Sequence, residues 1–156
     1  MLRLEIPGTE VLEIEHLILD YNGTIAAAGI LITGVAERLE KLSLSLEIHV
    51  LTADTYGSVH AQCSGMGVSV CVIGKEEQDK AKLAFLESLD ARRCIAVGNG
   101  RNDALMLSQA ALGFAVMQEE GLSMKAASES DVVFKTINDA LDALIHPNRL
   151  VATLRN

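Results

Sequence analysis

Residues 16–24 read HLILDYNGT, a short apolar run that ends in an acid and continues into small polar residues. A run of this length and character predicts a strand whose carboxyl end carries Asp20. Taken alone, Asn22-Gly23 between two apolar runs is equally typical of a plain hairpin turn. The rest of the chain has to decide between a turn and a functional site.

Outward from this stretch, short apolar runs alternate with stretches of helical spacing. The segments that we expect to be strands are 46–52, 68–73, 94–97, 112–116 and 132–134. Those that we expect to be helices are 34–42, 56–66, 80–89, 102–110 and 137–145. Strands separated by single helices indicate a doubly wound, mostly parallel Rossmann-like α/β sheet with right-handed crossovers. Segment 1–15 alternates apolar and charged residues, which fits an edge hairpin.

Length and charge narrow the classes of protein. A chain of 156 residues suits a single domain, 1–156. With 21 acidic and 13 basic residues, the net charge of −8 argues against nucleic acid or an anionic membrane as the main partner. A small phosphorylated substrate needs only local positive charge. No apolar run approaches the length of a membrane span and the start lacks a signal-peptide pattern, so we expect a cytoplasmic protein.

Polar residues follow three of the predicted strands. They are Asp20 to Thr24 after the first, Thr52-Ala53-Asp54 after the second, and residues 98–103 (GNGRND) after the fourth. Because ligands of open α/β sheets bind outside the carboxyl ends of the strands, these clusters are expected to converge on one edge.

Each later cluster also has a plain structural interpretation. Thr52 alone is best read as the cap of the next helix, and residues 98–100 as a loop followed by an N-cap at Asn102 or Asp103. The loop lacks the third glycine of a dinucleotide-binding fingerprint. What favours a functional site is the order along the chain: the acid with Asn-Gly-Thr, the strand-end threonine, a helix-borne lysine, and then Gly-x-Gly-x-Asn-Asp.

In that order, the motifs resemble those of the haloacid dehalogenase (HAD) superfamily. Asp20-Tyr21-Asn22-Gly23-Thr24 is similar to its D-x-D-G-T or D-K-T-G-T signature, and residues 98–104 are similar to the G-D-G-x-N-D-A of P-type ATPases. Leu51-Thr52-Ala53-Asp54 resembles their T-G-D. The nearest match is the group of soluble P-type-ATPase-like proteins, over roughly residues 14–146. Neither usual cap position has room for a cap domain, so the resemblance implies a capless phosphatase.

The resemblance implies a role for each matching residue. Asp20 would attack phosphorus and form an aspartyl phosphate, and Thr52 would donate its hydroxyl to the phosphoryl group. Asn22 would occupy the position of the usual acid–base aspartate. The remaining substrate contacts, including backbone N–H groups of residues 21–23, would come from Tyr21, Gly23, Thr24, Ala53 and Asn102.

A magnesium ion is the cofactor that the resemblance implies. Mg²⁺ prefers hard oxygen ligands, and the implied ligands are Asp20, the backbone carbonyl of Asn22, Asn99 and Asp103. Two of these positions depart from the superfamily pattern, because Asn22 and Asn99 stand where aspartates are usual. An amide cannot exchange a proton near neutral pH, and it gives the metal an oxygen without charge.

The phosphate-binding lysine has three candidates, Lys75, Lys80 and Lys82. In P-type ATPases this lysine opens a helix that carries apolar residues three, four and seven positions later. Lys82 meets the whole pattern and Lys80 only its first position, so we favour Lys82 over Lys80 by roughly two to one.

Two other functions compete with a phosphatase. Asn22 and Asn99 favour a phosphate-sensing or assembly module that has lost turnover. A signalling receiver domain would want a paired acid after the first strand, where this chain has Asp20 alone. Capless HAD proteins often form oligomers or act on large substrates, so a homo-oligomer and a large substrate are both open here. The partner that we expect is a small phosphorylated substrate.

Overall fold

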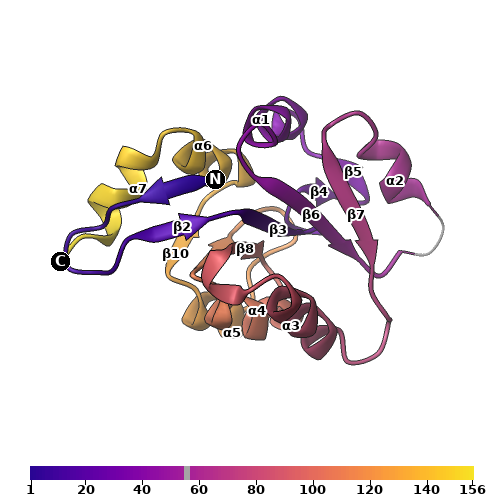
Figure 1. Ribbon diagram of the computed structural model, residues 1–156. Helices are drawn as coiled ribbons and strands as arrows, with labels where there is room; N and C mark the ends of the chain where they lie inside the picture. The colour runs from indigo at the N-terminus through magenta and orange to yellow at the C-terminus, as the bar shows by residue number, and fades with distance from the viewer. Residues whose placement is uncertain (55–56) are drawn as a thin grey trace.

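Six parallel strands form the central sheet of the computed structural model, which describes residues 1–54 and 57–156. Their order across the sheet is β10-β9-β8-β3-β6-β7 (Figure 1). This confirms the predicted Rossmann-like α/β fold. The strands are β3 (His16–Asp20), β6 (Glu47–Thr52), β7 (Val68–Val72), β8 (Cys94–Gly98), β9 (Leu112–Val116) and β10 (Val132–Phe134).

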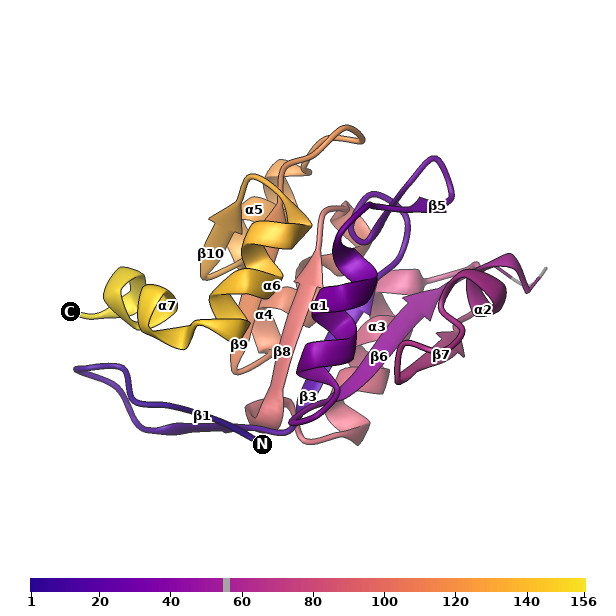
Figure 2. The same ribbon diagram turned by 90° about the horizontal axis from the view of Figure 1, so that it is seen from above.

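Helices cover both faces of this sheet. On one face α1 (Val35–Leu42) and α6 (Ile137–Ile145) lie side by side, and α7 (Pro147–Leu154) continues from α6 (Figure 2). The other face carries α3 (Gln78–Ser88), α4 (Ala104–Gln109) and α5 (Met124–Glu129) (Figure 1). Two short 3-10 turns, Ala91–Arg93 and Arg101–Asp103, precede β8 and α4.

The apolar strands are nearly continuous because both of their faces are buried. In β3, Leu17 and Leu19 pack into the cluster under α1 and α6, whereas Ile18 points into the cluster under α3 to α5. All three side chains are fully buried. Alternate residues of one strand therefore pack into two hydrophobic cores, one on each face of the sheet, as expected for a parallel sheet with helices on both sides.

Residues 1–15 form the predicted hairpin but not at an edge of the central sheet. Strands β1 (Leu2–Leu4) and β2 (Leu12–Ile14) pair antiparallel as a separate two-stranded sheet. Leu4 and Ile14 are buried in the cluster on the α6 side, and the N–H of Asn156 donates to the carbonyl of Pro7. The two strands therefore pair with each other and not with an edge strand of the central sheet, and the hairpin also contacts the C-terminal residue.

Three helices depart from the sequence prediction, and one of them is α7, which the sequence did not predict. The predicted helix 56–66 begins in residues outside the described part of the chain, and the part described is a shorter α2 (Ser58–Gln62). The segment between β9 and β10 contains α5, which we did not predict. Only Ala126 of α5 is buried, so the sequence carries too weak an apolar pattern to reveal it.

The connections next to the sheet's carboxyl edge are short. Between β3 and β6 the described chain has a hairpin, β4 (Ala26–Ala27) with β5 (Ile30–Leu31), followed by α1. From β6 to α3 it has α2 and β7. Within the described residues neither connection holds a cap domain. None of the helices in residues 1–54 and 57–156 is long and apolar enough to cross a membrane.

Candidate active site

A cavity of about 310 Å³ opens at the carboxyl edge of the central strands. The ends of β3 and β6, the first turns of α3 and the loop after β8 surround it. It therefore brings together the three motifs that the sequence placed after separate strands. Its lining residues are Asp20, Tyr21, Asn22, Thr52, Ala53, Gln78, Lys82, Asn99, Gly100 and Asn102.

A buried ionic triad lies at the base of this cavity. The Nζ atom of Lys82 donates to Oδ1 of Asp20 at 2.7 Å and to Oδ1 of Asp103 at 2.6 Å. The side chains of Lys82 and Asp103 are 1% and 0% exposed, and that of Asp20 is 13% exposed. With both carboxyls ionised, two negative charges share one ammonium, so the triad carries a net charge of −1.

Burial and the charges of the triad shift two pKa values. Burial, followed by repulsion from Asp103, raises the pKa of Asp20 from 3.8 to about 6, although Lys82 and Thr24 oppose the shift. Burial pulls the pKa of Lys82 down, but the attraction of Asp20 and Asp103 outweighs it and raises that pKa above its ordinary value. Lys82 is therefore a permanent cation facing the carboxyl of Asp20.

The second carboxyl oxygen of Asp103 organises the loop after β8. Its Oδ2 accepts the backbone N–H groups of Asn99 at 3.0 Å and Gly100 at 2.9 Å. A Cβ atom at Gly98 would lie 2.4 Å from the same carboxyl, so only glycine fits there. Both oxygens of Asp103 thus have protein partners.

Two oxygens converge on the hydroxyl of Thr24. Oγ1 lies 3.1 Å from Oδ2 of Asp20 and 3.2 Å from Oδ1 of Asn99. The amide of Asn99 is oriented by its Nδ2, which donates to the carbonyl of Gly121. A hydroxyl has one hydrogen and can donate to only one of the two oxygens at a time. The site therefore presents a carboxylate oxygen and an amide oxygen side by side.

The loop of the first motif differs in one respect from what the resemblance implies. The N–H of Gly23 donates to the carbonyl of Ala26 at 2.8 Å, so it does not face a phosphoryl group. Gly23 has a φ of +79°, and a Cβ there would lie 2.5 Å from Nδ2 of Asn99. Glycine is therefore required by the turn and by close packing against Asn99.

Of the other residues in this loop, Tyr21 and Thr24 are buried and Asn22 is exposed. Tyr21 is buried and its hydroxyl donates to the carbonyl of Gly29, which ties the β4–β5 hairpin to the loop. Thr24 is fully buried, so its side chain orients Asp20 rather than meeting a ligand directly. Asn22 is exposed at the cavity.

Thr52 ends β6 and lies beside the cavity. Its Oγ1 accepts the backbone N–H of Asp54 at 3.0 Å, which leaves the hydroxyl hydrogen available for a ligand. It is not a helix cap, since α2 begins after Gly57. Ala53 follows Thr52 in the lining.

The candidate lysines occupy very different environments. Lys82 is in the triad, whereas Lys80 is 68% exposed and pairs with Glu77. Lys75 is also exposed. Of the three, the structure brings only Lys82 to the cavity.

Sequence reasoning missed two glutamines near the site. Gln78 opens α3, lines the cavity and accepts a hydrogen bond from Nδ2 of Asn102 at 2.8 Å. Gln118 follows β9, donates to the carbonyl of Thr24 at 2.8 Å and accepts the N–H of Ile137 at 2.7 Å. A glutamine carries no sequence signal for such bridges. Only its position after a strand or at a helix start could have pointed to them.

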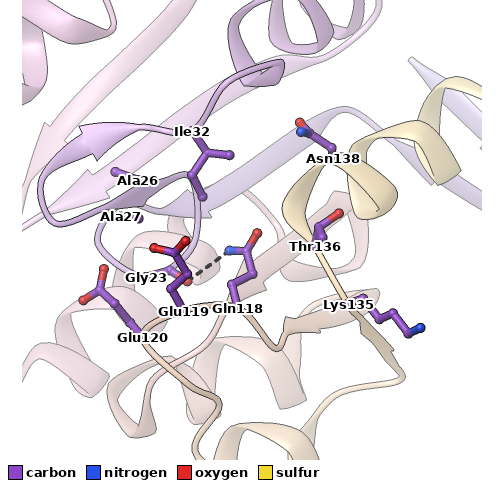
Figure 3. Close-up of a pocket in the computed structure, with 10 residues that line it drawn as sticks. All are labelled: Gly23, Ala26, Ala27, Ile32, Gln118, Glu119, Glu120, Lys135, Thr136 and Asn138. Atoms are coloured by element: carbon purple, nitrogen blue, oxygen red, sulfur yellow. Dashed lines mark hydrogen bonds between the residues drawn. The ribbon is translucent and has the colours of Figure 1, made fainter.

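A second pocket, of about 280 Å³, lies behind the first-motif loop. Figure 3 shows the Gln118 side chain reaching toward Gly23, with Glu119 and Glu120 nearby and Lys135 pointing away. The β4–β5 hairpin and the segments that follow β9 and β10 form its walls. Gly23 lines this pocket but not the cavity that contains Asp20.

Comparison with known proteins gives one close relative in sequence. No family model matches the chain. An uncharacterized protein of Methanocaldococcus jannaschii is 49% identical over 80 residues, which cover 49% of this chain and 86% of that protein. The chain belongs to the same family as that archaeal protein.

Solved structures establish the fold. A 3-deoxy-D-manno-octulosonate 8-phosphate phosphatase of Moraxella catarrhalis matches with a TM-score of 0.73 and 13% identity, over 91% of this chain and 94% of that one. The cobalt-bound deoxy-D-mannose-octulosonate 8-phosphate phosphatase of Haemophilus influenzae matches with a TM-score of 0.71 and 14% identity, over 92% of this chain and 94% of that one. A putative HAD superfamily hydrolase of Legionella pneumophila matches with a TM-score of 0.67 and 13% identity, over 90% of this chain and 87% of that one.

Proposed function

We propose that this chain, which has the fold of the HAD superfamily phosphatases, is a Mg²⁺-dependent phosphohydrolase that forms an aspartyl phosphate on Asp20. The observation that carries the proposal is the buried triad of Asp20, Lys82 and Asp103 beside a polar cavity. The Moraxella phosphatase was solved with a magnesium ion, a phosphate ion and a KDO molecule, which supports a small phosphorylated substrate here.

The donor set of the cavity fits a magnesium ion. Oδ2 of Asp20 and Oδ1 of Asn99 converge on Thr24, and the carbonyl of Asn22 would complete the protein ligands. These are hard oxygens, and Mg²⁺ usually keeps several waters besides one or two carboxylates. Because both oxygens of Asp103 have partners, we assign it contact with the metal through water. When bound, the ion would offset negative charge on the phosphoryl group.

The chain's own residues would then carry the transfer. Asp20 forms a bond from a carboxylate oxygen to phosphorus, and the bond to the leaving oxygen breaks. The ammonium of Lys82 holds Asp20 in place and offsets the charge of the incoming phosphate. The hydroxyl of Thr52 donates to the phosphoryl oxygens. The backbone N–H groups of Tyr21, Asn22 and Ala53 donate to them as well. Water then attacks phosphorus, the bond from phosphorus to the Asp20 oxygen breaks, and inorganic phosphate leaves while the Asp20 carboxylate is regenerated.

Asn22 makes this cycle slow. Neither the leaving group nor the attacking water can exchange a proton with an amide, and such help is typically worth about 10²–10⁴-fold in rate. A good leaving group, as in an aryl or acyl phosphate, needs no proton. Hydrolysis of the aspartyl phosphate is slowed with every substrate, because its attacking water has no general base. The phosphoenzyme should therefore accumulate, with a bias toward good leaving groups.

The test is burst kinetics on an aryl and an alkyl phosphate with Mg²⁺, and Asp20→Asn as the blank. Wild type should show a burst with the aryl phosphate. Asn22→Asp should raise the steady-state rate, most of all for the alkyl phosphate. If wild type hydrolyses both substrates equally fast without a burst, Asn22 does not occupy the acid–base position.

A second candidate is a phosphate-sensing or assembly module, which Asn22 and Asn99 favour because they remove two usual carboxylates. Full retention of phosphate binding with no turnover on any phosphomonoester or acyl phosphate would support it.

We further propose a single catalytic domain, 1–156, of the soluble P-type-ATPase-like group. Its cytoplasmic location and a homo-oligomeric state stay predictions, the latter testable by light scattering.

A further inference from the structure

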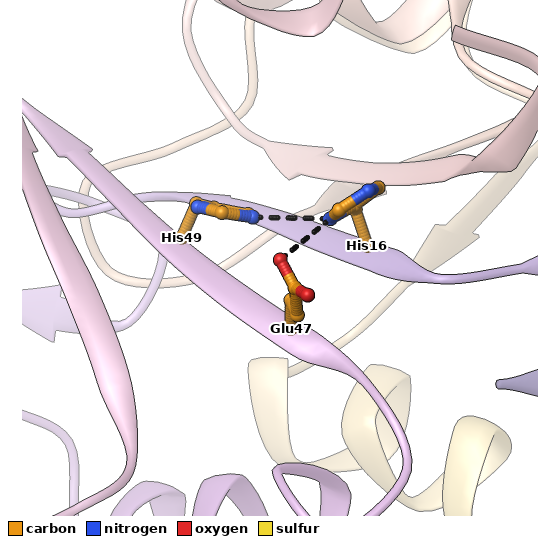
Figure 4. A group of neighbouring side chains, drawn as sticks. All are labelled: His16, Glu47 and His49. Atoms are coloured by element: carbon orange, nitrogen blue, oxygen red, sulfur yellow. Dashed lines mark hydrogen bonds and ion pairs between the residues drawn. The ribbon is translucent and has the colours of Figure 1, made fainter. Parts of the chain in front are cut away.

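Two histidines and a glutamate meet at the opposite, amino edge of the sheet. His16 opens β3 and Glu47 opens β6, and the two residues face each other in the strand register. His49 lies two residues further along β6 and therefore points to the same side. Figure 4 shows the two imidazoles and the carboxylate directed at one another.

The three side chains approach through their ligand atoms. Nδ1 of His16 lies 3.2 Å from Nε2 of His49 and 3.5 Å from Oε2 of Glu47. All three ligand atoms lie within 4.8 Å of one another. For comparison, a tetrahedral zinc ion with bonds of about 2.0–2.1 Å separates neighbouring ligand atoms by about 3.3 Å. The separations of 3.2 Å and 3.5 Å are close to this value.

One proton cannot satisfy this arrangement. If Nδ1 of His16 carries a hydrogen, it can point well at His49 or at Glu47 but not at both. If instead Nε2 of His49 donates to Nδ1 of His16, then Nδ1 is an acceptor and has no hydrogen to donate to the carboxylate of Glu47. Each protonation pattern of the neutral rings leaves two acceptors facing each other or one contact poorly made. A bound cation would accept electron pairs from all three groups.

The surroundings of the cluster are apolar on one side and open to solvent on the other. His49 is 9% exposed, and Phe85 of α3 packs edge-on against its ring at 5.4 Å. The side chain of Glu47 is 75% exposed, which leaves a path for an ion from solvent.

We propose that His16, Glu47 and His49 bind one transition-metal ion of the Zn²⁺ type, with the remaining coordination position open to water. Two imidazoles and one carboxylate suit Zn²⁺ rather than Mg²⁺, which prefers oxygen ligands. The ion would join the amino ends of β3 and β6, the strands whose carboxyl ends hold Asp20 and Thr52. This site is separate from the proposed Mg²⁺ site and does not depend on it.

The experiment is a calorimetric titration of the full chain with Zn²⁺ in saturating Mg²⁺, so that the oxygen-rich cavity is already filled. Wild type should bind one Zn²⁺ per chain. Glu47→Gln and His16→Gln should each weaken binding by about 10-fold or more. The matched control is His60→Gln, which removes an exposed histidine of α2 and should bind as wild type does. Asp20→Asn should also leave Zn²⁺ binding unchanged.

Thermal unfolding supplies a second readout. At Zn²⁺ concentrations about 100 times the dissociation constant, the melting temperature of wild type should rise by about 5–10 °C. Glu47→Gln should lose most of that rise. Because Glu47 is exposed, this variant keeps its fold even if a change at the buried His49 does not. Equal Zn²⁺ affinity in wild type, Glu47→Gln and His16→Gln, or no binding to wild type, would overturn the proposal.

Discussion

Replacing Asp20 by Asn should stabilise the metal-free protein at pH 7. The triad of Asp20, Asp103 and Lys82 holds two carboxylates against one ammonium, and the substitution leaves one balanced pair. The hydrogen bonds survive, because an amide oxygen can still accept from Lys82. The amide nitrogen can donate to Thr24, whose hydroxyl then donates to Asn99.

The pKa of Asp20 sets the size of the effect. Burial and repulsion from Asp103 raise it from 3.8 to about 6, so the folded state binds this proton more tightly than the unfolded chain does. The contribution of Asp20 to stability is therefore fully present below pH 3.8 and is lost as the pH rises to about 6. A shift of about two units corresponds to about 3 kcal/mol at pH 7, or about 6–12 °C in melting temperature.

The assay is urea unfolding of wild type and Asp20→Asn in a metal chelator at pH 4 and pH 7. Comparing the two proteins at each pH cancels the other titrating groups. The variant should be more stable by about 3 kcal/mol at pH 7 and by less than about 1 kcal/mol at pH 4. If the variant is no more stable at pH 7, or its advantage is the same at both pH values, the charge argument for the triad fails.

Two further predictions concern the same site. Lys82→Met leaves both carboxylates of the triad without their cation, so it should destabilise the protein at pH 7 by about 3–5 kcal/mol, whereas Asp20→Asn should stabilise it. If urea unfolding shows equal stability of wild type and Lys82→Met, then Lys82 carries no charge in the triad. Asn99→Asp adds a negative charge next to the carboxyl of Asp20, so it should tighten Mg²⁺ by about 1 kcal/mol or more; an unchanged calorimetric titration would place residue 99 away from the metal.

The sequence was most informative where one physical requirement dominates. Strands such as β3 and β8 are apolar on both faces, so their position and the site at their carboxyl ends could be predicted from residue type alone. The spacing of apolar residues after Lys82 predicted a helix, and the structure places this lysine, rather than Lys80, at the cavity.

The parts that sequence could not supply depend on contacts between distant segments. Gln118 joins the loop of Thr24 to the start of α6, and nothing local marks it. The N–H of Gly23 is used by Ala26, which only the folded turn reveals. His16 and His49 are brought together by the strand register. Short elements such as α5 bury too little apolar surface to leave a pattern.

The central claim is that Asp20 becomes phosphorylated, and direct detection of the phosphoenzyme tests it best. The protein is incubated with acetyl phosphate and Mg²⁺, quenched in acid and examined by intact-protein and peptide mass spectrometry. The account predicts one added phosphoryl group on the peptide containing Asp20 in wild type and in the control Asp139→Asn, an exposed carboxyl of α6, and none in Asp20→Asn. A phosphoryl group on another residue, or an equal adduct in Asp20→Asn, would contradict it.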